Sequence, residues 1–152
     1  MPRRDAYLRR ASFRGLLPKN AQAAAVGRGN RQRGSTPELM LQTALRSFRR
    51  RFDVNAVDLP GAPDIVFRRA RLAIFVDGDF WHARAWNKRR KKLRLGHNGK
   101  YWVSKIHGNR RRDRAVNREL GRLGWRVLRV WESDVLRASE HVLARIRESL
   151  LH

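Results

Sequence analysis

Three aspartates, Asp64, Asp77 and Asp79, lie in one short segment of the chain, and two aromatic residues and His82 follow them. Carboxylates held close together repel one another, and a bound cation is the usual reason to keep such a cluster. Mg²⁺ takes oxygen ligands and often retains waters that contact a phosphate substrate. The residue types therefore indicate a magnesium site acting on a phosphate. The alternative is that these aspartates are ordinary turn residues beside a proline and a glycine.

A β-hairpin would bring these carboxylates together. Residues 65–67 (IVF) and 72–76 (LAIFV) are apolar runs typical of strands, and the basic RRAR segment between them is typical of a tight turn. Asp64 opens the first strand, while Asp77 and Asp79 close the second. Antiparallel pairing therefore predicts all three side chains at one end of the sheet, with Asp77 and Asp79 on the same face.

The composition indicates a polyanionic partner. The chain has 36 Lys and Arg residues against 13 Asp and Glu residues, a formal net charge of +23. Each phosphate that such side chains neutralise releases condensed counterions, so nucleic acid is the first candidate and an anionic membrane the second. The same charge disfavours self-association and favours a monomer. With 152 residues and 41% hydrophobic content, the chain is long enough for one domain with a buried core.

The sequence has no cysteine, no run of about 20 apolar residues and no apolar core of a signal peptide. The lack of cysteine excludes disulfides, thiolate zinc sites and a cysteine nucleophile. We expect a cytoplasmic protein that is associated with the nucleoid and has no membrane partner.

Residues 1–35 are predicted to form a basic N-terminal arm. The arm contains nine Lys and Arg residues, among them Arg31 and Arg33, and one acid. Its sequence GRGNRQRGS resembles segments that become ordered on nucleic acid, and a disordered, solvated tail is the other interpretation. Residues 5–17 are expected to form a short helix within the arm. The folded domain is predicted to span residues 36–152.

The folded domain is predicted to begin with a helix from Ser35 to about Arg50. Ser35 suits the N-cap, a proline follows in the first turn, and Glu38 is an early acid. Glu38 has two interpretations: a favourable charge at the helix N-terminus, or an acid that reaches a metal or a metal-bound water. The apolar face of the helix is expected to consist of Leu39, Leu41, Leu45 and Phe48.

Strands and helices alternate in the rest of the chain. An edge strand is expected over residues 52–57, a helix over 109–123, and a strand over 125–131 (WRVLRVW) that is consistent with a central position. An amphipathic helix over 139–150 closes the chain. This order predicts an α/β fold, a three-layer αβα sandwich with a central mixed β-sheet.

The segment after the histidine, residues 84–114, loses clear apolar periodicity. It combines 13 Lys and Arg residues with one acid and with interleaved aromatic residues. Basic side chains, including Lys88, Arg89 and Arg90, can hold phosphates in a salt-dependent way, and aromatic side chains can stack on bases or wedge between them. Trp102 also fits core packing, because an isoleucine lies four residues later at an apparent helix start.

Four blocks of the sequence resemble the very-short-patch-repair mismatch endonucleases, a branch of the PD-(D/E)xK nuclease superfamily. The blocks are LPGAPDIVF, LAIFVDGDFWH, YWVSKIHGNRRRD and LGWRVLRVWE, and they lie in order between residues 31 and 136. The resemblance implies a restriction-endonuclease-like αβα sandwich. It also implies a magnesium-dependent enzyme, with one or two ions, that nicks double-stranded DNA next to a T:G mismatch, with mismatch-repair proteins as possible partners.

The resemblance also assigns roles in the chemistry. The family's metal-binding aspartate falls on Asp64, and the strand residue whose carbonyl binds Mg²⁺ falls on Val76. The catalytic histidine falls on His82, which would act as general base for the attacking water, and Glu38 would orient that water or one on the metal. The alternative for His82 is a histidine that only packs against Trp81.

Further positions of the resemblance contact DNA. Phe80 and Trp81 match an aromatic wedge that enters the duplex beside the mismatch. Lys105 and Asn109 match positions that touch the mispaired bases, and they share a helical face because they are four residues apart.

This chain departs from the family at three places. One is the N-terminal segment, which lacks the methionine that helps to wedge the DNA in the family, because the only methionines are Met1 and Met40. Family members bind a structural zinc with cysteines and a histidine, and the matching positions here are Asp79, Arg84, Trp86 and Ser133. We therefore expect no zinc, with packing by Trp86 and a pair between Arg84 and Asp79 in its place. A second active-site histidine is replaced by Asp77, which is either an additional metal ligand or a charge that weakens phosphate binding.

We expect a magnesium-dependent DNA endonuclease that makes single-strand nicks. One alternative is a restriction, homing or phage-defence nuclease of the same fold that needs no mismatch. The other is a basic nucleic-acid-binding protein whose carboxylates do not catalyse.

Overall fold

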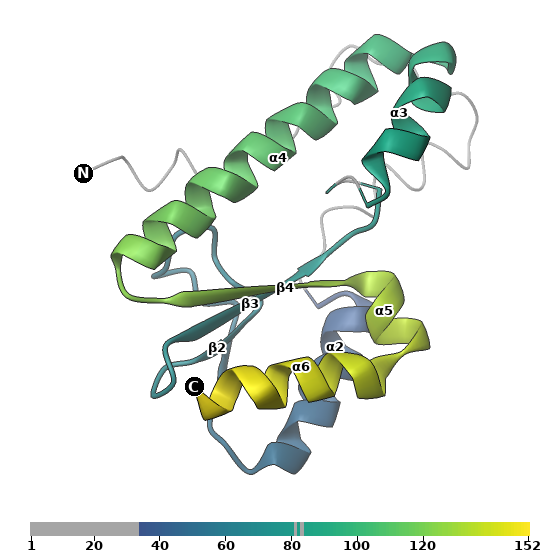
Figure 1. The fold of residues 1–152 in the computed structure, drawn as a ribbon. Coiled ribbons are helices and arrows are strands. Elements are labelled where there is room, and N and C mark those ends of the chain that lie inside the picture. Colours follow the sequence, from purple (N-terminus) through teal and green to yellow (C-terminus); the bar gives the residue numbers. More distant parts are fainter. Residues whose placement is uncertain (1–33, 81, 83) are drawn as a thin grey trace.

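The computed structural model describes residues 34–80, 82 and 84–152 (Figure 1). Residues 1–33 of the predicted arm, with Arg31, Arg33 and the helix expected over 5–17, lie outside the described residues, as does Trp81. The helices are α2 (Thr36–Leu45), the 3₁₀ turn η2 (Arg46–Phe48), α3 (Trp86–Leu95), α4 (Gly99–Arg122), α5 (Glu132–Arg137) and α6 (Ser139–Leu151). The strands are β1 (Asp53–Val54), β2 (Ile65–Phe67), β3 (Leu72–Asp77) and β4 (Arg126–Trp131).

The strands form one mixed sheet in the order β1-β2-β3-β4. The predicted hairpin is confirmed, because β2 and β3 pair antiparallel with Ile65 opposite Ile74. The predicted edge strand is confirmed as the short β1. Strand β4 pairs parallel with β3 and lies at the other edge of the described sheet, so its expected central position is wrong. Its apolar residues are explained by the helices on both faces, not by a strand on each side.

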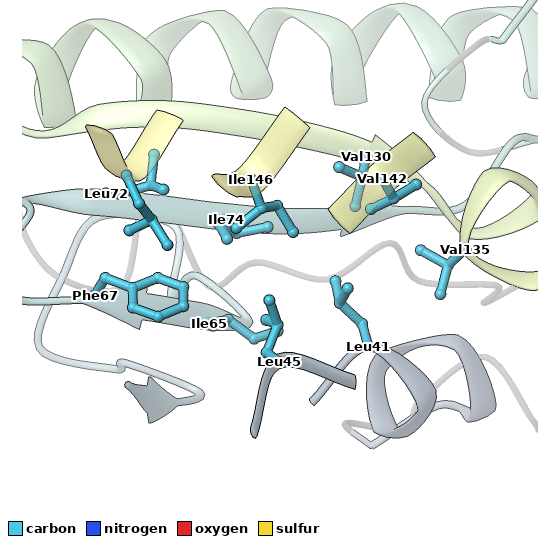
Figure 2. Packing of buried hydrophobic residues seen from close by; sticks show 11 residues of the cluster. Leu41, Leu45, Ile65, Phe67, Leu72, Ile74, Val130, Val135, Val142 and Ile146 are labelled. Carbon is cyan, nitrogen blue, oxygen red and sulfur yellow. The ribbon is translucent and has the colours of Figure 1, made fainter. Parts of the chain in front are cut away.

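Helices cover both faces of the sheet, as the αβα prediction requires (Figure 1). Leu72 and Ile74 of β3 point to the face covered by α2, α5 and α6, where Figure 2 shows the main apolar core. Ala73 and Phe75 point to the opposite face and belong to a smaller cluster with Val116 and other residues of α4. Burial of each large core side chain contributes about 1.5–3 kcal/mol to the stability of the fold. Because this core holds β2 and β3 in place, it also holds the polar residues at the ends of these strands.

Helix α2 begins as predicted but differs at its C-terminal end and on its apolar face. The α-helix ends at Leu45, and η2 follows it up to Phe48. Leu41 and Leu45 are buried as expected, whereas Leu39 is 53% exposed. At about 100° per residue, Leu39 lies about 160° around the helix from Leu41 and so points away from the sheet.

Two helices, α3 and α4, occupy the segment that showed little periodicity. Helix α4 begins at Gly99, ten residues before the predicted start at 109, and α3 was not predicted. Six of the ten residues of α3 are Lys or Arg, and Trp86 is its buried residue. Lys and Arg are good helix formers, but such a helix has no apolar stripe for a sequence pattern to show.

The C-terminal elements complete the core. Helix α6 buries Val142, Ile146 and Leu150, as predicted for the closing helix. The short helix α5 was not predicted, and it contributes Val135 to the core. Among the described residues, no helix combines the length and the apolar character needed to cross a membrane.

Candidate active site

Asp64 is placed by a turn that has no room for a side chain at Gly61. Gly61 has a φ of +75°, and a Cβ atom there would lie 2.6 Å from a methyl carbon of Val116 on α4. The main-chain N–H of Asn55 donates to the carbonyl of Asp64 over 2.9 Å. The turn is therefore packed against α4 on one side and tied to β1 on the other, so Asp64 enters β2 in a fixed orientation.

The carboxylate of Asp64 is desolvated and close to other acids. Its Oδ2 accepts a hydrogen bond of 2.7 Å from the main-chain N–H of Val76, so the two predicted metal ligands are neighbours. Burial raises the pKa of Asp64 to about 7, repulsion from Glu38 and Asp77 adds to the rise, and the Val76 N–H opposes it. A cation bound to Asp64 would keep this acid ionised at neutral pH.

Glu38 secures the start of α2, as one of its two interpretations predicted, and its contact with a metal or a metal-bound water stays a prediction. It lies in the first turn of α2 and is 8% exposed. Its carboxylate accepts hydrogen bonds from the Gly34 N–H at 2.7 Å and the Ser35 hydroxyl at 3.1 Å, which secures the start of the helix. The same charge is close enough to raise the pKa of Asp64. Glu38 is thus a helix-start residue that also lies close to Asp64.

His82 is held by two carboxylates. Its Nδ1 lies 2.7 Å from Asp113 Oδ2 and 3.6 Å from Asp77 Oδ1. Burial alone would lower the pKa of the imidazole, but the hydrogen bond to Asp113 and the charge of Asp77 outweigh it and raise the pKa above its ordinary value of 6.5. The His82 N–H of the main chain donates to the carbonyl of Gly78 over 3.1 Å, which closes the turn after β3.

Asp77 is paired with an arginine that the sequence did not single out. Arg129 Nη1 lies 2.8 Å from Oδ1 and 3.0 Å from Oδ2 of Asp77, which is 5% exposed. Burial raises the pKa of Asp77, and the positive charges of His82 and Arg129 counteract this rise. The arginine therefore offsets the negative charge of Asp77.

Sequence reasoning missed Asp113 and Arg129. Asp113 is the one acid among the 13 basic residues of the segment 84–114, and that isolation is the signal that could have identified it. Arg129 interrupts the apolar pattern of β4. Its position opposite Phe75 in the parallel pairing of β4 with β3 places it in the site, and no local pattern encodes that pairing.

A divalent cation fits the Asp64 part of the site better than the Asp113 part. Ligand atoms of Asp77, His82 and Asp113 all lie within 4.8 Å of one another. However, Arg129 Nη1 lies 2.8 Å from Asp77 and 3.4 Å from Asp113, so its charge would oppose a second cation there. At Asp64, oxygen donors and mutual repulsion between carboxylates favour a hard cation.

Asp79 does not join this pocket, which corrects the expectation that all three aspartates cluster and that Asp77 and Asp79 share a face. Strand β3 ends at Asp77, so the two-residue period does not extend to Asp79. Asp79 instead accepts hydrogen bonds from Arg84 Nη1 at 3.2 Å and from the Ser133 hydroxyl at 2.7 Å. The same Arg84 nitrogen donates to Asp134 over 2.7 Å.

The contacts expected in place of zinc are confirmed. Arg84 pairs with Asp79, and it also donates to Ser133 Oγ over 2.6 Å. Trp86 is 9% exposed and packs edge-on against His107 with ring centroids 5.1 Å apart. A guanidinium with hydrogen-bonded partners therefore ties the segment after β3 to the start of α5.

The residues predicted to contact DNA lie on α3, α4 and the loop after β3. Phe80 is 37% exposed and packs edge-on against Trp102, which is half-buried and is not a member of either apolar core cluster of the described residues. Lys105 and Asn109 lie one turn apart on α4. The exposed basic residues Lys88, Arg89 and Arg90 lie on α3, which runs beside the first half of α4 (Figure 1).

A mixed sheet between two helical layers, with carboxylates where β2 begins and β3 ends, is the architecture of a restriction-endonuclease-like nuclease. The family model described as DNA mismatch endonuclease Vsr matches residues 18–88. The chain is 35% identical over 121 residues to the type II nicking enzyme V.NmeDIP of Neisseria meningitidis serogroup C, covering 80% of each chain. It is 36% identical over 121 residues to the type II nicking enzyme V.HpaIIP of Haemophilus parainfluenzae, covering 80% of this chain and 84% of the relative.

A further relative is the DNA mismatch endonuclease Vsr of Escherichia coli, which is 40% identical over 82 residues that cover 53% of this chain and 50% of the relative. The chain therefore belongs to the Vsr endonuclease family, and it is a DNA endonuclease. The resemblance drawn from the four sequence blocks is confirmed.

Proposed function

We propose that this endonuclease uses Mg²⁺ to nick one strand of double-stranded DNA. The observation that carries the proposal is a linked set of side chains. His82 Nδ1 is held by Asp113 at 2.7 Å and lies 3.6 Å from Asp77, and Asp77 and Glu38 are near enough to Asp64 to raise its pKa. Two relatives bear the name nicking enzyme, which supports cleavage of a single strand.

One or two magnesium ions would be held by the Asp64 carboxylate and the main-chain carbonyl of Val76. When bound, Mg²⁺ supplies a Lewis acid that polarises the scissile phosphate and lowers the pKa of a coordinated water. Asp77 is an additional ligand in this proposal only if it exchanges its pair with Arg129, and the observed pairing favours a charge-balancing role.

His82 is the general base of the proposed reaction. The hydrogen bond between Nδ1 and Asp113 favours the tautomer with its proton on Nδ1, which leaves Nε2 with a lone pair. Nε2 accepts a proton from the attacking water, and the negative charges of Asp113 and Asp77 stabilise the imidazolium that forms. Glu38, fixed at the start of α2, orients that water or a water on the metal.

We assign the DNA contacts to basic and aromatic residues of α3, α4, the segment after β3 and the N-terminal arm. Phe80 and Trp81 act as a wedge that partly unstacks the duplex. Lys105 and Asn109 face the bases, as their common face on α4 allows. Contacts to phosphates come from Lys88, Arg89 and Arg90 on α3 and from Arg31 and Arg33 in the arm.

The substrate that we propose is a T:G mismatch, with mismatch-repair proteins as partners and the nucleoid as the place of action. One relative carries the name DNA mismatch endonuclease. Relatives named type II nicking enzymes support the alternative that only a defined sequence is needed. Nicking rates on matched and T:G-mismatched duplexes of the same sequence distinguish the two, and equal rates would remove the mismatch requirement.

Digestion of supercoiled plasmid with and without Mg²⁺ tests the reaction itself. Because a fully paired plasmid contains no T:G mismatch, the digest is run beside a mixture of T:G-mismatched duplexes. Magnesium-dependent open circles or nicked duplexes are expected from the wild type, and none from Asp64→Ala, while DNA affinity is retained. Linear plasmid would indicate a double-strand cutter. The absence of product on both substrates would leave a protein that only binds DNA.

A further inference from the structure

We propose that Arg129 is a positioning residue for His82: its guanidinium fixes the two carboxylates, Asp77 and Asp113, that hold the imidazole. This inference rests on the proposed role of His82 as general base. It assigns a function to a half-buried arginine on β4, which is far in sequence from the segment that carries the histidine.

The four side chains form a closed ring in which the two nitrogen-bearing groups, the guanidinium and the imidazole, alternate with the two carboxylates. Arg129 Nη1 lies 2.8 Å from Asp77 and 3.4 Å from Asp113. His82 Nδ1 lies 3.6 Å from the same Asp77 oxygen and 2.7 Å from the other oxygen of Asp113. Each carboxylate is thus bridged by the arginine on one side and the histidine on the other.

Arg129 is itself held from two further directions. Its Nε donates to Asn117 Oδ1 over 3.1 Å, and its guanidinium carbon lies 4.3 Å from the ring centroid of Phe75. Asn117 lies one turn after Asp113 on α4, so both side chains face the strand that carries the arginine. The guanidinium is therefore preorganised, with its side chain 20% exposed.

The carboxylates need this cation because they lie close together in a partly desolvated site. Asp77 and Asp113 both approach the same imidazole nitrogen, and like charges at that separation repel strongly where water is excluded. Without Arg129, repulsion would move the two acids apart. That movement would loosen the hydrogen bond that orients His82.

The ring also affects the net charge of the site that a DNA phosphate would approach. Two carboxylates beside Asp64 and Glu38 would repel a phosphate backbone. Arg129 compensates one of these charges from inside the protein, where its contacts to Asp77, Asp113 and Asn117 already occupy it. Its role is therefore directed at the carboxylates and not at the DNA.

The test compares Arg129→Ala with the matched control Arg126→Ala. Arg126 lies on the same strand and donates to the carbonyl of Ala70, away from the pocket. Single-turnover cleavage is measured with enzyme in excess, and DNA affinity is measured in Ca²⁺. We expect Arg129→Ala to slow cleavage about 10–100-fold, as loss of an orienting partner does elsewhere, with nearly unchanged affinity. Arg126→Ala should cleave at the wild-type rate per folded molecule.

Cleavage is also measured with guanidinium ion added at a non-denaturing concentration. If Arg129 only stabilised the fold, the added ion would not change the cleavage rate of Arg129→Ala. We expect the ion to partly restore cleavage by Arg129→Ala and not to help His82→Ala. If Arg129→Ala does not fold, the pair Asp77→Asn and Arg129→Gln keeps the inference testable. The double variant should be less impaired than the product of the two single effects, because it removes both charges together.

Two results would overturn the inference. One is an unchanged cleavage rate in Arg129→Ala, and the other is a loss of DNA affinity with an unchanged rate at saturation, which would assign the arginine to phosphate binding. Failure of the proposed function gives a different pattern, since His82→Ala would then cleave normally.

Discussion

Two arginine-centred clusters hold the segment that follows β3, and they use similar groups for different purposes. Arg129 contacts Asp77 and Asp113, and both of these acids contact His82. Arg84 contacts Asp79 and Asp134 together with a serine hydroxyl, and no histidine is among the partners of this cluster that the described residues show. The composition of the two clusters is thus alike, and what differs is whether a proton-accepting group is attached.

Position in the fold explains the difference. Arg129 projects from a strand onto the ring of Phe75 beneath α4 and is 20% exposed, whereas the Arg84 side chain is 36% exposed and lies over Trp131. Charges in the less solvated cluster interact more strongly and hold their geometry better. Under the proposed mechanism, the cluster of Arg129 is the one that contains a base, and its arginine is the less exposed of the two.

The largest expected effect is the removal of that base. His82→Ala should slow magnesium-dependent cleavage by about 10²–10⁴-fold, which is the usual contribution of general base catalysis. His141→Ala is the matched control, because His141 is exposed on α6. Single-turnover rates on nicked-product gels measure both variants. Equal rates in the two variants would show that His82 is only a packing residue.

Replacing one aspartate by asparagine in each cluster tests the comparison between the two clusters directly. Asp113→Asn should slow cleavage about 10–100-fold, because it removes the negative partner of the imidazole. Asp134→Asn, the equivalent change beside Arg84, should leave the rate per folded molecule nearly unchanged. Equal losses of activity in the two variants would contradict the idea that the Arg129 cluster supports catalysis and the Arg84 cluster does not.

The pH dependence of cleavage follows from the same cluster. The pKa of His82 is raised above 6.5, so the neutral imidazole needed by a base becomes available only as pH rises through that higher value. Below it, the single-turnover rate should fall about tenfold per pH unit. Asp77→Asn should shift the midpoint to lower pH, because it removes a charge that favours the imidazolium. A rate that falls with rising pH would instead make His82 a general acid.

The stability of the metal-free protein should depend on the ionisation of Asp64, because its charged form is desolvated and repelled by nearby acids. Burial raises its pKa from 3.8 to about 7, so its contribution to stability is fully present below pH 3.8 and is lost as pH rises towards and through 7. Asp64→Asn should therefore raise the Tm at pH 8 in EDTA while abolishing cleavage. Added Mg²⁺ should stabilise the wild type more at pH 8 than at pH 5.5, and it should not stabilise Asp64→Asn. A lower Tm for this variant at pH 8 would contradict the assignment.

The smallest expected effect on chemistry belongs to Arg84. Arg84→Ala should lower the Tm because it removes contacts to Ser133, Asp79 and Asp134. Arg84→Ala should change the cleavage rate per folded molecule less than Asp113→Asn does. Because we expect no bound zinc, a chelator of zinc should leave the Tm of the wild type unchanged. Differential scanning fluorimetry and metal analysis check this, and stoichiometric bound zinc would contradict it.

Local patterns in the sequence predicted the elements that local physics determines. The hairpin of β2 and β3 follows from two β-branched runs and a basic turn, and Asp64 and Asp77 follow from its ends. The closing helix α6 follows from the spacing of Val142, Ile146 and Leu150. In each case, the periodicity of apolar residues matches the face that the sheet buries.

The rest depends on contacts that are distant in sequence. Asp113 reaches His82 across 31 residues, and Arg129 reaches Asp77 across 52. Both depend on the parallel pairing of β4 with β3 and on the packing of α4 over these strands. Helix α3 was missed for another reason: its charged residues make a stable helix that buries almost nothing.

The most direct test of this account is a nuclear magnetic resonance spectrum of the protein labelled with ¹⁵N-histidine, in which His82→Gln identifies the signal of His82. The account predicts a protonated Nδ1 in a strong hydrogen bond, with an Nε2 that titrates above pH 6.5 and with a signal that moves markedly in Asp113→Asn. A His82 signal that exchanges between tautomers like a solvated imidazole and does not respond to Asp113→Asn would contradict the account.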